Sequence, residues 1–163
     1  MGTVVRLRRL LLEVTARLRF LPPLLARVAV GAVFVQTGWG KLHNLDQIVG
    51  FFRELGIPAP ELQAPFVATV EFVGGIMILL GLGARLAAAL LTCTMVVATV
   101  TAVWPQVDGI LELLGKIEVL YFVLFVWIAV AGPGAISLDA ILARRLDRDR
   151  GKYPQHAGRP ALA

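Results

Sequence analysis

Cysteine and histidine are scarce in this sequence. The chain of 163 residues has one cysteine, Cys93, and two histidines, His43 and His156. A single thiol cannot cycle as an intramolecular dithiol, and no CxxC motif is present, so a self-contained thiol–disulfide oxidoreductase is excluded. The two histidines are far apart and lack the spacing of metal ligands. We therefore expect no covalent cofactor and no haem or metal site within this chain.

Charge is also scarce, and alternating strand patterns are missing. Charged residues make up 17% of the chain, against about 25% in a typical soluble domain, and the mean hydropathy is +0.78. Apolar residues occur in blocks long enough to cross a bilayer as helices. The pattern predicts an all-α integral membrane four-helix bundle with short amphipathic interfacial helices. The predicted spans are about 24–42, 62–83, 86–107 and 117–134.

Positive charge is distributed unevenly between the two sides of these spans. Most Lys and Arg residues lie before residue 28, after residue 132 or at Arg85 in the tight link between the second and third spans. The positive-inside rule then places both termini in the cytoplasm and the protein in the plasma (inner) membrane. Anionic lipid accounts for the basic composition, so we expect the lipid bilayer as a partner and no nucleic acid.

The chain divides into three parts. Residues 1–21 form a basic segment with the pattern of an interfacial helix. Residues 22–139 hold the four spans, and the link over residues 43–61 contains an amphipathic helix that lies on the outer face like a lid. Residues 105–116 also lie outside, with a short interfacial turn. Residues 140–163 form a basic cytoplasmic tail that is expected to be partly disordered.

Small residues recur at four-residue steps in the third predicted span. Thr94, Ala98 and Ala102 form one such row, and Ala88 with Thr92 forms another. In lipid, rows of small side chains let helices approach closely. Ordinary packing within the bundle and an interface in a homo-oligomer both fit this pattern.

Glu71 is the most informative polar residue, because it lies near the middle of a predicted span. A carboxylate at that depth costs about 2.5–3.5 kcal/mol on insertion scales. We expect it to face the bundle interior, near Gln36 at a similar depth, and to be protonated unless a cation pairs with it. A neutral glutamic acid that joins helices by hydrogen bonds is one interpretation, and a proton-exchanging or ligand-binding group is the other.

Lys41, Glu118 and His43 are predicted near the outer ends of the spans. Lys41 and Glu118 fall at equal depth and carry opposite charge, so we expect an ion pair or a shared polar pocket at the mouth of the bundle. The alternative for Lys41 is that its ammonium reaches interfacial water. His43 lies on nearly the same helix face as Gln36, where it lines an entrance or is a solvated loop residue.

Four stretches in this order resemble the DoxX family of small four-helix membrane proteins: FVQTGWGKL, GIPAP, EFVGGIMILLGLGARLAA and GKIEV followed by GPGAISLD. The resemblance runs from about Arg27 to Asp139. The positions that match the family pattern are Gly38, Lys41, Glu71, Gly74, Gly75, Arg85, Glu118 and Asp139, with Arg27 matching more loosely.

The resemblance implies a quinone-linked role, because members are similar to the small membrane subunit of thiosulfate:quinone oxidoreductase and of quinol oxidase systems. The expected function is an accessory membrane subunit of a respiratory or redox complex that binds quinone or anchors a redox partner. The proposed ligand-binding or proton-exchanging residues are Gln36, Lys41, His43, Glu71 and Glu118, with no catalytic residue assigned. A non-catalytic assembly factor or structural subunit is the alternative, and a small-solute transporter is a weaker one.

Overall fold

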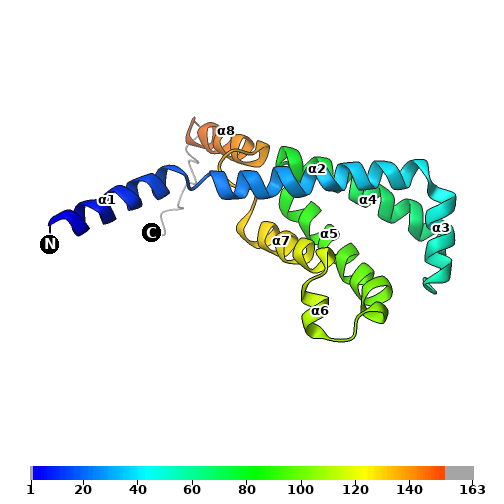
Figure 1. Ribbon diagram of the computed structural model, residues 1–163. Coiled ribbons are helices and arrows are strands. Elements are labelled where there is room, and N and C mark those ends of the chain that lie inside the picture. Colours follow the sequence, from blue (N-terminus) through cyan, green and yellow to red (C-terminus); the bar gives the residue numbers. More distant parts are fainter. Residues whose placement is uncertain (1, 153–163) are drawn as a thin grey trace, which may run out of the picture.

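The computed structural model describes residues 2–152, and every regular element in that range is helical. Figure 1 shows the order along the chain. The helices are α1 (Gly2–Arg17), α2 (Leu21–His43), α3 (Leu45–Glu54), α4 (Pro60–Leu80), α5 (Ala84–Ala98), α6 (Ile110–Leu114), α7 (Ile117–Ala131) and α8 (Leu138–Lys152). A π-helical segment, Thr99–Val103, and a 3₁₀ turn, Trp104–Gln106, extend α5.

Prolines and glycines set the ends of the long helices. Prolines occupy the first positions of α2 and α4, where a missing backbone N–H costs nothing because it has no partner in the helix. Gly81 ends α4 in the left-handed conformation, which glycine adopts without steric cost. Gly132 has φ +86° and ends α7, and Pro133 follows it. The fourth predicted span, 117–134, is therefore shorter as a helix than the sequence suggested.

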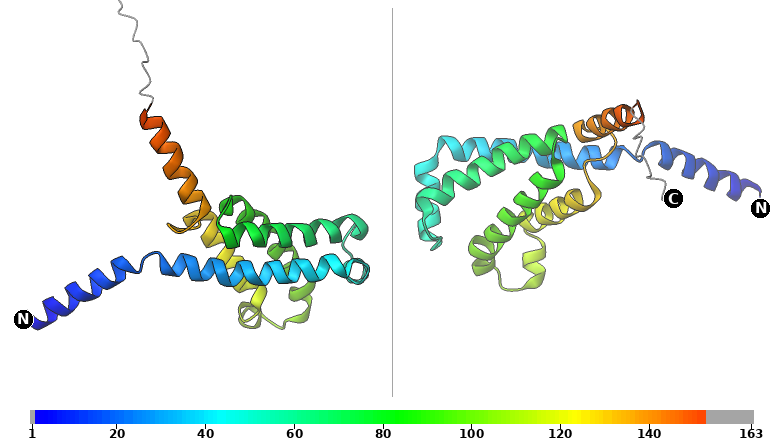
Figure 2. Two further views of the ribbon diagram at one scale, coloured as in Figure 1. Left: turned by 90° about the horizontal axis from the view of Figure 1, so that it is seen from above. Right: turned by 180° about the vertical axis from the view of Figure 1, so that it is seen from behind.

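The bundle consists of two helix pairs. Helices α2 and α4 run side by side, α5 packs against α7, and α4 joins the pairs through its contact with α5 (Figures 1 and 2). The pairs meet near the α4–α5 turn and diverge toward the end that carries α3 and α6. The core lies where the pairs meet, and its largest fully buried side chains are Phe125, Ile78, Leu91, Ile128 and Val30.

Glycines hold α2 and α4 at close range. A Cβ added to Gly75 would lie 2.6 Å from the backbone nitrogen of Val35, and one added to Gly31 would lie 2.9 Å from that of Leu79. A Cβ on Gly38 would collide with the backbone of Phe72. These contacts fix the register of the two helices, and α4 also packs against α3.

Arg27 and Asp139 tie the ends of several helices together. The Arg27 guanidinium is buried and donates to the carbonyl oxygens of Pro133 at 2.8 Å and Ile136 at 2.6 Å. The Asp139 carboxylate accepts from the backbone N–H groups of Gly83 and Ala84, at the start of α5. These bonds explain why the stretch GPGAISLD, after the last span, is ordered against the bundle.

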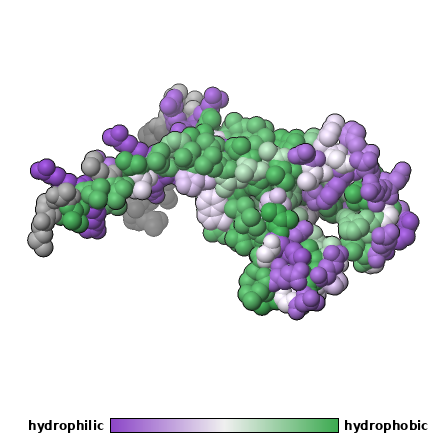
Figure 3. Space-filling model, in the orientation of Figure 1, coloured by the Kyte–Doolittle hydropathy of each residue, from purple (hydrophilic) through white to green (hydrophobic). Residues whose placement is uncertain are grey.

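The surface is that of a membrane protein. Three segments are long and apolar enough to cross a bilayer: Leu21–His43, Pro60–Leu80 and Ala84–Gln106. Helix α7 is equally apolar, but at 15 residues it is shorter than the roughly 20 residues that span a bilayer core. Figure 3 shows apolar residues across the middle of the bundle, with hydrophilic residues gathered near α3, α6 and α8.

The smaller predicted elements have mixed outcomes. The link over residues 43–61 contains the expected amphipathic helix as α3, and the third link contains the short α6. Helix α1 forms over most of the segment 1–21, and it leads away from the bundle (Figure 1). Its place at a membrane surface stays a prediction. Of the tail 140–163, α8 covers the part up to Lys152, and the expected disorder lies outside the described residues.

Candidate functional site

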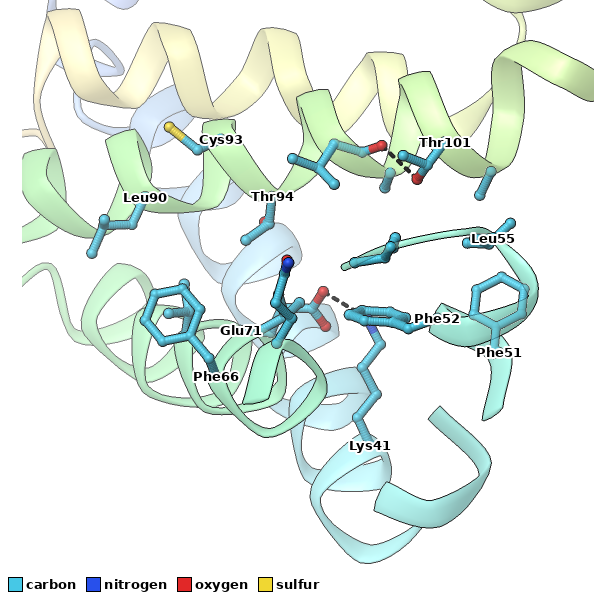
Figure 4. A pocket seen from close by; sticks show the side chains of 17 residues that line it. Lys41, Phe51, Phe52, Leu55, Phe66, Glu71, Leu90, Cys93, Thr94 and Thr101 are labelled. Atoms are coloured by element: carbon cyan, nitrogen blue, oxygen red, sulfur yellow. Dashed lines mark hydrogen bonds and ion pairs between the residues drawn. The ribbon is translucent and has the colours of Figure 1, made fainter. Parts of the chain in front are cut away.

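A cavity of about 250 Å³ lies between α3, α4 and α5, in the half of the bundle where the helix pairs diverge. Figure 4 shows this α4–α5 pocket, whose walls are mainly apolar. Phe66 and Val70 line it from α4, Leu90 and Val97 from α5, and Phe52 from α3. Phe66, Leu90 and Val97 are also partly exposed on the bundle surface. The pocket therefore opens sideways, toward the region that lipid occupies around the spans.

The charged groups of the pocket are Lys41 and Glu71. The Lys41 ammonium Nζ donates to Glu71 Oε1 at 2.6 Å, and the dashed line in Figure 4 marks this ion pair. The Glu71 side chain is 3% exposed, whereas that of Lys41 is 31% exposed. The pair therefore places one ammonium and one carboxylate in an apolar setting, where each group needs the other.

The second carboxylate oxygen of Glu71, Oε2, is buried and has no hydrogen-bond partner in the described part of the chain. Figure 4 shows the carboxylate pointing from α4 into the space beside Phe52 and Thr94. A charged acceptor without a donor is costly in the interior of a protein. Oε2 is thus the polar atom of the pocket that most needs a partner.

The α5 wall is formed by small residues and an irregular helix. Thr94, Ala98 and Ala102 all line the pocket, so the row of small side chains leaves room for a cavity. The π-helical segment Thr99–Val103 begins directly after Ala98. Such segments are rare and occur frequently at functional sites. The Thr94 and Thr101 hydroxyls donate to carbonyl oxygens of their own helix at 2.9 and 2.8 Å, so they offer a ligand only their lone pairs.

A second, almost wholly apolar groove of about 210 Å³ adjoins the pocket along α4 and α5. The two spaces share Phe66, Val70 and Leu90 as lining residues, and the groove continues to Met77 and Leu86. The two neighbouring spaces follow α4 and α5 toward the α4–α5 turn, and Lys41 and Glu71 supply the charged groups of the first. That shape suits an amphipathic molecule with a small polar head.

The structure brings together two of the five predicted site residues. Lys41 and Glu71 are in contact, but the predicted pair of Lys41 with Glu118 is wrong, because the Lys41 ammonium pairs with Glu71 on α4 instead. The Glu118 side chain makes no ion pair or hydrogen bond within the described residues. The Glu71 carboxylate is paired with a cation, which is one of the two states expected for a carboxyl group at that depth.

Gln36 and His43 are not part of the pocket. Gln36 is exposed on the opposite side of α2, so its predicted place beside Glu71 is wrong even though the depth was close. His43 is exposed, with Nδ1 2.9 Å from the Trp39 carbonyl oxygen and its ring in tilted contact with the Trp39 indole, at an interplanar angle of 46°. Sequence reasoning also missed the α3 aromatic residue Phe52 and the α5 row as pocket walls. The four-residue steps of that row were the available signal.

The arrangement defines a class: a small all-helical membrane protein with a laterally open, mainly apolar pocket that holds one partly buried ion pair. Within residues 2–152, no three His, Cys, Asp or Glu side chains lie close enough to hold a metal ion. The DoxX family model matches residues 23–104, which is half of the chain and includes Lys41, Glu71 and the α5 wall. The chain belongs to the DoxX family.

Relatives cover most of the chain. "Putative oxidoreductase CatD" of Bacillus subtilis is 28% identical over 71% of this chain and 83% of its own length. "Inner membrane protein YqjF" of Escherichia coli is 28% identical over 75% and 92%. "Uncharacterized membrane protein Rv3486" of Mycobacterium tuberculosis is 34% identical over 73% and 80%. No solved structure matches the chain.

Proposed function

We propose that this protein is an accessory membrane subunit of a quinone-linked redox complex and that the α4–α5 pocket binds the quinone. The observation that carries the proposal is the mainly apolar space along α4 and α5 that contains the Lys41–Glu71 ion pair. A quinone needs the same features: a slot for a flat ring, a channel for an apolar tail and hydrogen-bond donors at the carbonyl groups. The pocket at about 250 Å³ suits one substituted ring.

The lateral opening supports the same ligand class. A quinone reaches its site through lipid, and the exposed Phe66 and Leu90 side chains border an entrance at that level. Lys41 supplies a positively charged donor at the ring end. The chain has no dithiol of its own, so electrons would come from a partner subunit. One relative is named an oxidoreductase, which fits a redox setting.

The test is the quinone content of the purified protein. The full chain is extracted from its native membranes in mild detergent, and bound quinone is measured after organic extraction as moles per mole of protein. Wild type is expected to retain close to one quinone. A matched pair of variants separates the pocket from the lipid-facing surface. Ala98→Phe fills the pocket, whereas Ala89→Phe puts the same ring on the exposed, opposite face of α5.

We expect Ala98→Phe to lose the quinone and Ala89→Phe to keep it. Equal retention by both variants, or lipid alone in the wild-type extract, would contradict the proposal. A stoichiometric large partner that copurifies with a quinone-free chain would favour the alternative role, an assembly or structural subunit.

A further inference from the structure

Hydrogen-bond donors and acceptors in the α4–α5 pocket are not paired one to one. Lys41 Nζ uses one donor on Glu71 Oε1 and has two more N–H groups. Glu71 Oε2 is an acceptor with no donor. The hydroxyl protons of Thr94 and Thr101 are already donated to carbonyl oxygens of their own helical segments. One N–H of the Gln63 amide donates to the Pro58 carbonyl oxygen at 2.6 Å, and its second N–H makes no hydrogen bond to Oε2. The pocket therefore lacks a donor at Oε2 and has spare donors at Lys41.

A hydroxyl group satisfies both requirements, and a carbonyl group satisfies only one. A ligand O–H placed beside the ion pair donates its proton to Glu71 Oε2 and accepts from the Lys41 ammonium through its lone pairs. A ligand carbonyl accepts from Lys41 but brings a second set of lone pairs against Oε2, which then stays unpaired. Leaving a buried charged acceptor without a partner is the larger penalty.

We propose that Glu71 and Lys41 make this pocket selective for a ligand whose buried polar end is a hydroxyl group, which for a quinone-type ligand means the reduced, quinol form. The inference rests on the proposed function, and it adds which redox form the site holds and which residue selects it. Glu71 acts as the acceptor that determines specificity, and Lys41 orients the carboxylate and contacts the same ligand oxygen.

The experiment compares three probes with one skeleton: decylubiquinol, decylubiquinone and the dimethyl ether of decylubiquinol. The full chain is reconstituted in phosphatidylcholine nanodiscs without oxygen, and the bound probe is quantified by mass after washing. Nanodiscs that carry the Ala98→Phe variant measure partition into lipid and are subtracted. The ether keeps the ring and tail of the quinol but has no proton to donate, so the comparison isolates the hydrogen bond to Oε2.

We expect the quinol to bind at least about tenfold more tightly than the ether and the quinone. Equal affinity for the quinol and the ether would overturn the inference while leaving quinone binding intact. Absence of pocket-specific binding by all three probes would remove the proposed function itself, so the two failures are distinguishable.

Glu71→Gln provides the second arm. The amide oxygen still accepts from Lys41, and the amide nitrogen places a donor where Oε2 was an acceptor. The preference for the quinol over the quinone should fall below about twofold or reverse. A Glu71→Gln variant that folds and keeps the full preference would show that another group selects the ligand. If the variant does not fold, the wild-type comparison of quinol with ether decides alone.

Discussion

At the scale of single residues, the ion pair of Lys41 with Glu71 dominates the energetics of the pocket. Removing one partner of a desolvated pair leaves an unmatched charge, which costs about 3–5 kcal/mol. Lys41 is partly exposed, so we expect Lys41→Met to lower the free energy of unfolding by about 3 kcal/mol. Reversible unfolding in mixed detergent micelles measures the change.

A matched control for this prediction lies on the surface. Arg53 and Glu61 form a pair of the same length, 2.6 Å, but both side chains are more than 60% exposed. Solvent screens such pairs, and they contribute little. Arg53→Met should therefore leave the unfolding transition nearly unchanged. Equal losses for the two variants would mean that burial does not decide the role of the Lys41 pair.

The same ion pair shows what residue counting predicts and what it misses. The sequence identified Lys41 and Glu71 as functional candidates because charges are rare in the spans. It paired Lys41 with Glu118 because both residues fall near helix ends, on the assumption that all spans share one outer boundary. The contact of Gly38 with Phe72 places Glu71 level with the last turns of α2, within reach of the Lys41 side chain. Registers between helices depend on three-dimensional packing and cannot be counted along one chain.

At the scale of helices, the close approach of α2 and α4 is the main structural requirement. A methyl group on Gly38 meets the backbone of Phe72, which cannot move aside as a flexible side chain can. Gly38→Ala should therefore cost about 1–3 kcal/mol of stability through overpacking. Gly40 lies two residues away on the same helix with no atom within 4 Å of the added Cβ.

Gly40→Ala is thus the control for that prediction, with the same chemical change at an open position. It should be neutral or slightly stabilising, since alanine is the better helix former. The two variants are compared by unfolding in detergent micelles. Each variant is also combined with Lys41→Glu, Glu71→Lys and both changes together, and recovery of stability in the double exchange shows that the Lys41–Glu71 contact is retained. A stable Gly38→Ala variant would show that the helices separate more easily than these contacts indicate.

Helix α1 carries an untested expectation about the membrane surface. Leu7, Leu11 and Val14 are exposed on one side of its axis, and Arg9 and Glu13 lie on the other. Such a helix binds in the plane of an anionic bilayer with its apolar side down. The amphipathic period made this helix predictable from sequence, whereas its direction relative to α2 depends on the turn at Leu18–Phe20.

Spin labels on the two sides of α1 test this placement in a Cys93→Ser background. In vesicles that contain phosphatidylglycerol, a label at Leu11→Cys should be relaxed mainly by oxygen, which concentrates in lipid. A label at Glu13→Cys should be relaxed mainly by a water-soluble nickel complex. Equal accessibility of both positions to the nickel complex would place α1 in water.

At the scale of the whole molecule, the hydropathy of the sequence was sufficient to predict the fold class. Long uncharged blocks have one structural solution in lipid, because helices satisfy their backbone hydrogen bonds internally. The α4–α5 pocket was not predictable in the same way. It exists because the helix pairs diverge, and the divergence follows from packing at Arg27, Asp139 and the core between the pairs. The row Thr94, Ala98 and Ala102 was interpreted as a packing face within the bundle or in a homo-oligomer, whereas it lines the pocket.

The orientation of the bundle is the remaining prediction, and it determines which side of the membrane the pocket faces. Helices α3 and α6 lie at one end, and α1 and α8 at the other (Figure 1). The excess of Lys and Arg at the α1–α8 end places that end in the cytoplasm, so the Lys41–Glu71 pair would lie nearer the outer surface. In a Cys93→Ser background, cysteines at Asp46 and Asp108 should react with a membrane-impermeant maleimide in intact cells. A cysteine at Arg145 should react only after lysis, and the opposite pattern would invert the orientation and place the polar end of the pocket near the cytoplasm.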